Sequence, residues 1–197
     1  MRLLDLTRFP PPARFDSRPS VYTLDDGIAS RLVRLPAVRD RLQSSIYFAE
    51  TAAKQQPEWA ASAHLRAALA EFVSMGEVQT LDIPSAANFE TKHSLNPLVQ
   101  LMTLLRHFNI HTGTLNLQSH SVSAQWAGTN RQVQTAIVRD LTLASLAAVR
   151  DTKHFLPDDL KVMLDWFHVA QCHWGAGYVF RIGAEAFASE LADHHNL

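Results

Sequence analysis

The sequence contains a single cysteine, Cys172, which excludes an intrachain disulfide. It has no apolar run of about 18 residues, and this excludes a membrane-spanning helix. Glycine-rich phosphate loops, nucleophile elbows and paired-carboxylate motifs are also missing. The first residues include Arg2, Asp5 and Arg8 and lack the apolar core of a secretory signal. We therefore expect a cytoplasmic protein that needs no membrane and no cofactor.

Charge of one sign is also scarce, because the formal net charge is −1. A broadly basic nucleic-acid-binding surface is therefore not expected. The distribution is nevertheless uneven, since residues 1–41 hold eight arginines and five aspartates, a balance of +3 that leaves −4 for the rest. This arginine-rich segment either touches phosphates, which match the guanidinium fork, or is simply a solvated edge.

Apolar residues make up 47% of the chain, and most of them recur at helical spacing. Residues 1–35, interrupted by Pro10-Pro11-Pro12 and Arg18-Pro19, are expected to form an irregular N-terminal arm. Residues 36–197 are expected to form one helical domain. The fold class predicted is mainly α, a bundle of about five helices with a small antiparallel β-hairpin or meander inserted at about 112–138.

The expected helices have recognisable boundaries. The first runs from Pro36 to about Gln56, and the second starts at Pro57 and ends near Gly76. The third begins at Asn96-Pro97, a cap followed by a proline, and Gly113 should end it. A further helix is expected after Pro157, broken by Gly175 and Gly177, and a last one over Val179–Leu191. Their predicted common core comprises Leu65, Leu69, Phe72, Leu101, Leu105, Leu164 and Phe167.

Alternation replaces the helical period after Gly113. Three short runs, Thr114–Leu117, Val122–Trp126 and Val133–Ile137, predict strands. Polar turns are expected between them, at Gln118–Ser121 and Gly128–Arg131. Leu141–Val149 either extends the third strand or forms a helix.

The end of the third helix carries the residues of greatest chemical interest. The apolar run from Leu98 to Leu105 closes with Arg106-His107-Phe108-Asn109-Ile110-His111. A guanidinium can hold a phosphate in a bidentate manner, and an imidazole can move a proton near neutral pH. We therefore take Arg106 and His111 as candidate catalytic residues and His107 and Asn109 as candidate supporting groups.

This segment resembles the signature of the HEPN superfamily, small helical-bundle domains that include many RNases. The signature is an arginine, usually a polar residue next, and a histidine after four to six intervening residues, as in Arg106 to His111. The resemblance covers residues 36–111 and, as further helices, 157–192. It implies a metal-independent endoribonuclease or a descendant of one, with RNA as the partner.

Such a reaction needs a base for the ribose 2′-OH, a cation for the phosphorane and an acid for the leaving oxygen. Positions 106 and 111 differ by about 140° on an ideal helix. Arg106 and His111 therefore reach one phosphate only if the helix unwinds or if two subunits pool their residues. We accordingly expect a homodimer in which the two helix ends face each other. The alternative is an inert helical module for dimerisation or for binding a partner or nucleotide, with Arg106 and His111 tied into structural hydrogen bonds.

A second cluster, His168, Cys172 and His173, has a one-turn spacing that can ligate zinc. The remaining ligands would have to come from elsewhere, and packing of a cysteine on an amphipathic helix explains it as well. No metal site is therefore assigned. Trp166, Phe167 and Trp174 are interpreted as core or subunit contacts.

Overall fold

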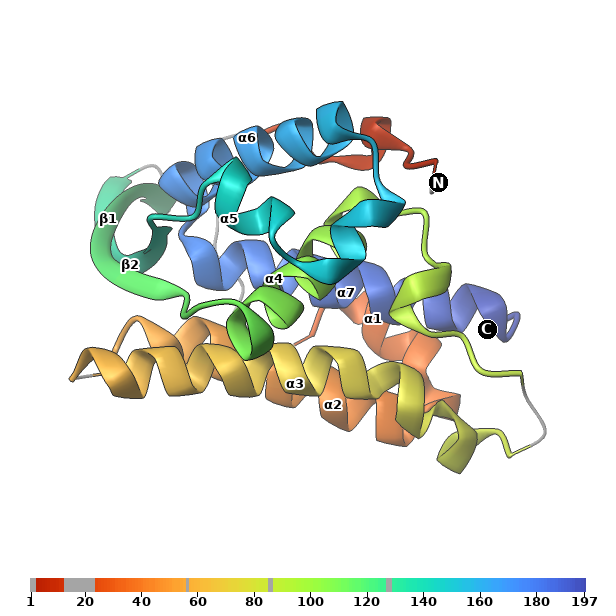
Figure 1. Cartoon of the computed structure of the whole chain (residues 1–197). Coiled ribbons are helices and arrows are strands. Elements are labelled where there is room, and N and C mark those ends of the chain that lie inside the picture. Colours follow the sequence, from red (N-terminus) through yellow and green to blue (C-terminus); the bar gives the residue numbers. More distant parts are fainter. Residues whose placement is uncertain (1–2, 13–23, 56, 85–86, 127–128) are drawn as a thin grey trace.

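The computed structural model describes residues 3–12, 24–55, 57–84, 87–126 and 129–197, with only the backbone of 124–126. Five long helices form the body of the protein (Figure 1). They are α2 (Pro36–Ala52), α3 (Glu58–Asp82), α4 (Pro97–His111), α6 (Pro157–Trp174) and α7 (Ala176–His194). Two shorter helices are α1 (Asp26–Arg31) and α5 (Leu143–Ala147), and the strands are β1 (Asn116–Trp126) and β2 (Thr129–Arg139). Four 3₁₀ turns complete the described elements: η1 (Leu6–Arg8), η2 (Leu32–Arg34), η3 (Thr91–His93) and η4 (Arg150–His154). The mainly α fold with a small β insertion is thus confirmed.

Local sequence sets the start of α4. Asn96 lies in extended backbone, and its side chain accepts a hydrogen bond from the backbone N–H of Leu98, as expected of a cap. Pro97 occupies the first turn, where its missing N–H costs nothing. The helix ends at His111, and Gly113 follows with its N–H bonded to the carbonyl of Phe108. The boundaries predicted for this helix are confirmed.

The helices stack in three layers (Figure 1). The long pair α2 and α3 forms one outer layer, α4 and α7 lie in the middle, and α5 and α6 cover the other side. The hairpin closes one end of the stack and contacts α3, α6 and α7. Because α4 is covered from several sides, every residue from Pro97 to Leu105 is buried.

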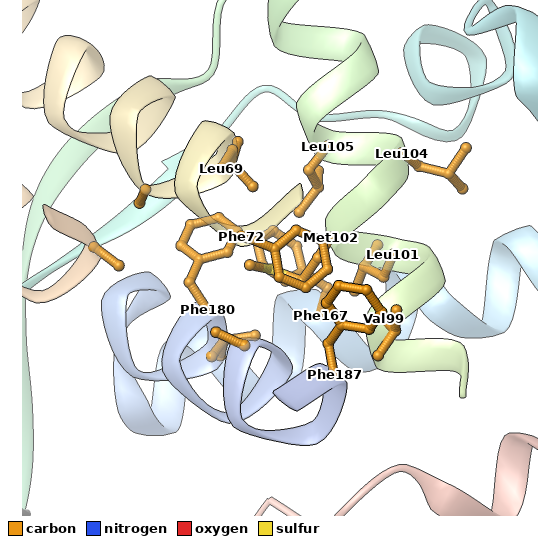
Figure 2. Close-up of a cluster of buried hydrophobic side chains, with 14 of the residues drawn as sticks. Leu69, Phe72, Val99, Leu101, Met102, Leu104, Leu105, Phe167, Phe180 and Phe187 are labelled. Carbon is orange, nitrogen blue, oxygen red and sulfur yellow. The ribbon is translucent and has the colours of Figure 1, made fainter. Parts of the chain in front are cut away.

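The core lies where α3, α4, α6 and α7 meet. Figure 2 shows the rings of Phe72, Phe167, Phe180 and Phe187 gathered beside the aliphatic side chains of α4. Phe72 and Phe187 approach with ring centroids 5.4 Å apart, within the range of favourable aromatic pairs. All seven residues predicted to share the core are buried.

The hairpin differs from the predicted meander. Asn116–Trp126 is one continuous strand, so the turn expected at Gln118–Ser121 is wrong. The polar residues suggested a turn, but they belong to a strand whose exposed side chains bond to its partner strand. The side chain of Gln134 donates to Ser121, and that of Gln132 donates to Ser123, both at 2.9 Å. The second predicted turn overlaps the connection at 127–128, which lies outside the described residues, and β2 already begins at Thr129. Leu143–Ala147 is helical, which resolves the alternative left open for Leu141–Val149.

Two glycines were expected to interrupt helices and do not. Gly76 lies inside α3, which continues to Asp82, because the backbone of Phe89 approaches it and leaves only 3.1 Å for an added Cβ. Gly177 lies inside α7, where an added Cβ would lie only 2.7 Å from the carbonyl oxygen of Ala49. These glycines permit close packing instead of ending a helix. Gly175 does separate α6 from α7, with φ of +79°.

The N-terminal segment is less irregular than expected. Residues 24–35 contain α1 and η2, and Leu32 and Leu35 are fully buried. Phe9 stacks on Trp166 of α6 with ring centroids 4.5 Å apart. Several arginines of the segment form ion pairs within the body, such as Arg8 with Glu190 and Arg31 with Asp193. These arginines act structurally, whereas Arg14 and Arg18 lie outside the described residues.

Candidate active site

The last turn of α4 extends beyond the core. Burial is complete up to Leu105, is partial at Arg106 and His107, and gives way to exposure at Ile110 and His111. The same helix therefore has an apolar first half, fixed by packing, and a polar end that reaches solvent. Residues 107 and 111 are four apart and so lie on one face of the helix.

His107 has a specific carboxylate partner. Its Nδ1 contacts Oδ2 of Asp151 in η4, and the His107 side chain retains 23% of its exposure. Burial lowers the pKa of His107 below the ordinary 6.5 and outweighs the neighbouring carboxylate, which acts in the opposite direction. The neutral form of His107 is therefore more favoured than it is in a free imidazole. When its Nδ1–H faces Asp151, Nε2 is the ring nitrogen that keeps a lone pair.

These two residues border an open cleft of about 390 Å³. His111 lies one helical turn beyond His107, with ring centroids 6.3 Å apart, and it also lines the cleft. Arg150 lines the opposite part, in η4, and makes no ion pair within the described part of the chain. The complete lining is His107, His111, Thr112, Val149, Arg150 and Asp151. Two imidazoles, a guanidinium and a carboxylate thus share one water-accessible space.

Of the four residues chosen from sequence, the structure brings His107 and His111 together in this cleft. Arg106 is half-buried, does not line it, and has an Nε that is buried without a hydrogen-bond partner among the described residues. Asn109 does not line it either, because its Oδ1 accepts the backbone N–H of Leu115 at 3.1 Å. Since α4 stays helical to His111, unwinding does not bring Arg106 and His111 onto one phosphate within a single subunit.

Two buried residues anchor η4 against the body. The hydroxyl of Thr152 donates to the carbonyls of Ala147 and Val149, at 3.0 and 2.6 Å. Phe155, immediately after the turn, is buried in the core. These anchors hold Arg150 and Asp151 beside the end of α4. Sequence reasoning missed both residues, since nothing local to η4 indicates that it meets a helix about forty positions earlier.

A second hollow, of about 430 Å³, is a weaker candidate. Its acids already neutralise arginines, as Glu190 does with Arg8 at 2.9 Å. His194, which also lines it, bonds the carbonyl of Ala87 at 3.0 Å. These ionisable groups are therefore already engaged in holding elements of the fold together.

The zinc alternative has no geometric support in the described part of the chain, where no three His, Cys, Asp or Glu side chains are placed to hold a metal ion. His168 instead bonds the carbonyl of Leu141 at 3.0 Å, and Cys172 is exposed. Phe167 and Trp174 are buried, as expected of core residues. No described helix is both long and apolar enough to cross a bilayer.

Comparison of the chain with protein-family models, with curated proteins and with solved structures gave no match.

Proposed function

We propose that this protein is a metal-independent endoribonuclease that cleaves RNA through attack of the ribose 2′-OH. One observation carries the proposal: His107, held by Asp151, and His111 line the same open cleft. Two imidazoles on one helical face provide one group to accept a proton and one to donate it. The resemblance of this segment to the HEPN signature supports the same reaction class.

In the proposed step, Nε2 of His107 takes the proton from the 2′-OH. The 2′-oxygen forms a bond to phosphorus while the bond from phosphorus to the 5′-oxygen breaks, and His111 delivers a proton to that leaving oxygen. The products are a 2′,3′-cyclic phosphate and a 5′-hydroxyl. Asp151 orients the His107 ring and stabilises the imidazolium that forms, as a carboxylate does in other histidine-based sites.

The charge on the phosphorane needs a cation within the cleft. Arg150 is the arginine that lines it, so we assign the phosphate-binding role to Arg150 within one subunit. Arg106 takes this role only if a second copy presents its α4 end to the cleft. The two arginines therefore make different demands on the assembly, and substituting each of them separates the alternatives.

The test is incubation of mixed single-stranded RNA with the purified protein in EDTA. We expect cleavage that leaves cyclic phosphates and fails on DNA of the same sequence. His111→Ala should reduce the rate by about 100-fold or more, because proton transfer contributes on that scale. His173→Ala, at an exposed histidine of α6 outside the cleft, is the matched control.

Cleavage that survives in both His107→Ala and His111→Ala would overturn the proposal. Binding of RNA by the wild type without cleavage would favour the inert binding module instead.

We further propose a homodimer in which the two α4 ends face each other. Ile110, next to His111, leaves 51% of its surface exposed and supplies apolar area at that end. An isologous contact would place both copies of Arg106 and His111 about one axis. Light scattering should then give twice the chain mass of 22.0 kDa, and Ile110→Lys should return the protein to a monomer. A monomer at micromolar concentration would defeat the dimer and leave the single-subunit site with Arg150.

We place the activity in the cytoplasm, where the exposed thiol of Cys172 stays reduced.

A further inference from the structure

The turn η4 carries two side-chain cations, Arg150 and Lys153, and of these only Arg150 lines the cleft. Arg150, Lys153 and His154 are all exposed, whereas Asp151 is engaged by His107 and Thr152 points its hydroxyl to backbone carbonyls. Within the described residues, neither Arg150 nor Lys153 has an ion-pair partner. Asp151 lies between these two cations with one negative charge, so the three residues have a net charge of +1. Thr152 and Phe155 hold the backbone of the turn in place.

The geometry of a 3₁₀ turn places these two cations in register. With three residues per turn, Lys153 lies directly above Arg150 on the same side, about 6 Å farther along the axis. Arg150 enters the cleft from that side, and Lys153 lies outside the cleft lining. The two cations are thus arranged with Arg150 in the cleft and Lys153 just outside it.

We propose that Lys153 is a substrate-positioning residue that binds the phosphate next to the one being cleaved, so that the site prefers polynucleotide chains to dinucleotides. This inference rests on the proposed function for the chemistry of the cleft. An exposed lysine suits the role because a flexible ammonium contacts a phosphate as a point charge and reads no base. The preference for chain length would then arise from phosphate count and not from sequence.

The first experiment measures kcat/KM for a dinucleotide and for a single-stranded RNA oligonucleotide. Wild type should favour the oligonucleotide, and Lys153→Ala should reduce this preference about threefold to tenfold, through KM for the oligonucleotide. Lys161→Ala is the matched control, because Lys161 is also an exposed lysine but lies on α6 and pairs with Asp165. It should keep the wild-type preference.

The second experiment needs no cleavage. A 2′-O-methyl RNA oligonucleotide keeps the phosphates and lacks the attacking hydroxyl, so its equilibrium binding is measured over a range of salt concentrations. Loss of one phosphate contact should reduce the salt slope by about 0.7 in Lys153→Ala and leave Lys161→Ala unchanged.

The outcomes separate this inference from the proposed function. If wild type cleaves RNA but Lys153→Ala and Lys161→Ala behave alike in both experiments, the subsite is wrong and the endoribonuclease stands. If no RNA is cleaved but the salt slope falls only in Lys153→Ala, the subsite stands and the endoribonuclease is wrong. Equal loss on dinucleotide and oligonucleotide, or no binding of the probe by wild type, overturns the subsite.

Discussion

The imidazole of His107 on α4 contacts the carboxylate of Asp151 on η4. This contact joins two segments that are far apart in the sequence. It fixes which ring nitrogen of His107 keeps a lone pair, and it brings Arg150 to the same cleft. The pair thus connects the buried helix to the turn that supplies positive charge.

Protonation of His107 should reduce the stability of the fold. Burial lowers the pKa of His107 below 6.5, so the unfolded chain binds this proton at a higher pH than the folded chain does. The free energy of unfolding should therefore fall as pH drops below about 6.5, until the folded pKa is also passed. Urea unfolding at about pH 7.5 and about pH 5.5 measures this loss, which should be smaller in His107→Gln than in wild type.

His195 shifts in the same direction and remains in both proteins, so the difference between them isolates His107. His173→Gln serves as the control for replacing an exposed histidine. Equal pH dependence in wild type and His107→Gln would show that the contact with Asp151 cancels the effect of burial.

Replacing the two arginines should affect catalysis unequally. Arg150→Ala should lower kcat about 100-fold if its guanidinium stabilises the phosphorane, the scale found for removing one such donor. Arg106→Ala should change kcat by less, because Arg106 does not line the cleft of its own subunit. Single-turnover rates for both variants, with thermal unfolding to verify the fold, make the comparison. A larger loss in Arg106→Ala would show that the phosphate binds at a shared site on a dimer axis and not beside Arg150.

Gln171 should be a strong determinant of stability. Its amide fastens the hairpin to α6, because Oε1 accepts from the N–H of Val138 at 2.8 Å and Nε2 donates to the carbonyl of the same residue at 3.0 Å. Gln171→Ala leaves both buried backbone groups without a partner, and we expect a loss of about 2–4 kcal/mol. Chemical denaturation measures it. Gln134→Ala, which removes an exposed cross-strand bond to Ser121, should cost less than about 1 kcal/mol. Similar losses for the two variants would contradict the role of Gln171.

Gly175 should tolerate no side chain. Its φ of +79° disfavours any other residue, and an added Cβ would lie 1.8 Å from Oγ1 of Thr135. Gly175→Ala should destabilise the protein by about 3 kcal/mol or more, from backbone strain and collision together. Thr135→Gly should restore part of this stability in the double variant, which thermal unfolding would reveal. A double variant as unstable as the sum of the two single variants would mean that Thr135 is not the obstacle.

The sequence was most informative where a local rule acts alone. Asn96-Pro97 and Pro157 mark helix starts because capping and the missing proline N–H operate within one turn. The core residues followed from helical periodicity, which reports burial on one face. Such signals were sufficient to predict the fold class and the five long helices.

It was least informative where a distant segment changes the meaning of a residue. Gly76 resembled a helix end, but the approach of Phe89 makes it an internal packing position. Ser119 and its neighbours resembled a turn, but β2 pairs with them. The candidate site divides in the same way. The end of α4 was identified from its own residues, whereas Asp151 and Arg150 enter the cleft only through the path of the chain after β2.

The uneven anchoring of the cleft determines how it can move. The helix that carries His107 and His111 is enclosed by the core as far as Leu105, so the amide protons of its buried turns should exchange only in rare openings of the whole molecule. The opposite wall is a single short turn whose position depends on the two anchors Thr152 and Phe155. Because the cleft is open, a ligand can enter without displacing either wall, and any adjustment of its shape falls to the short turn. The residence time of a bound molecule should then depend on how firmly Thr152 holds this turn, which a mutation at Thr152 would change without altering either imidazole.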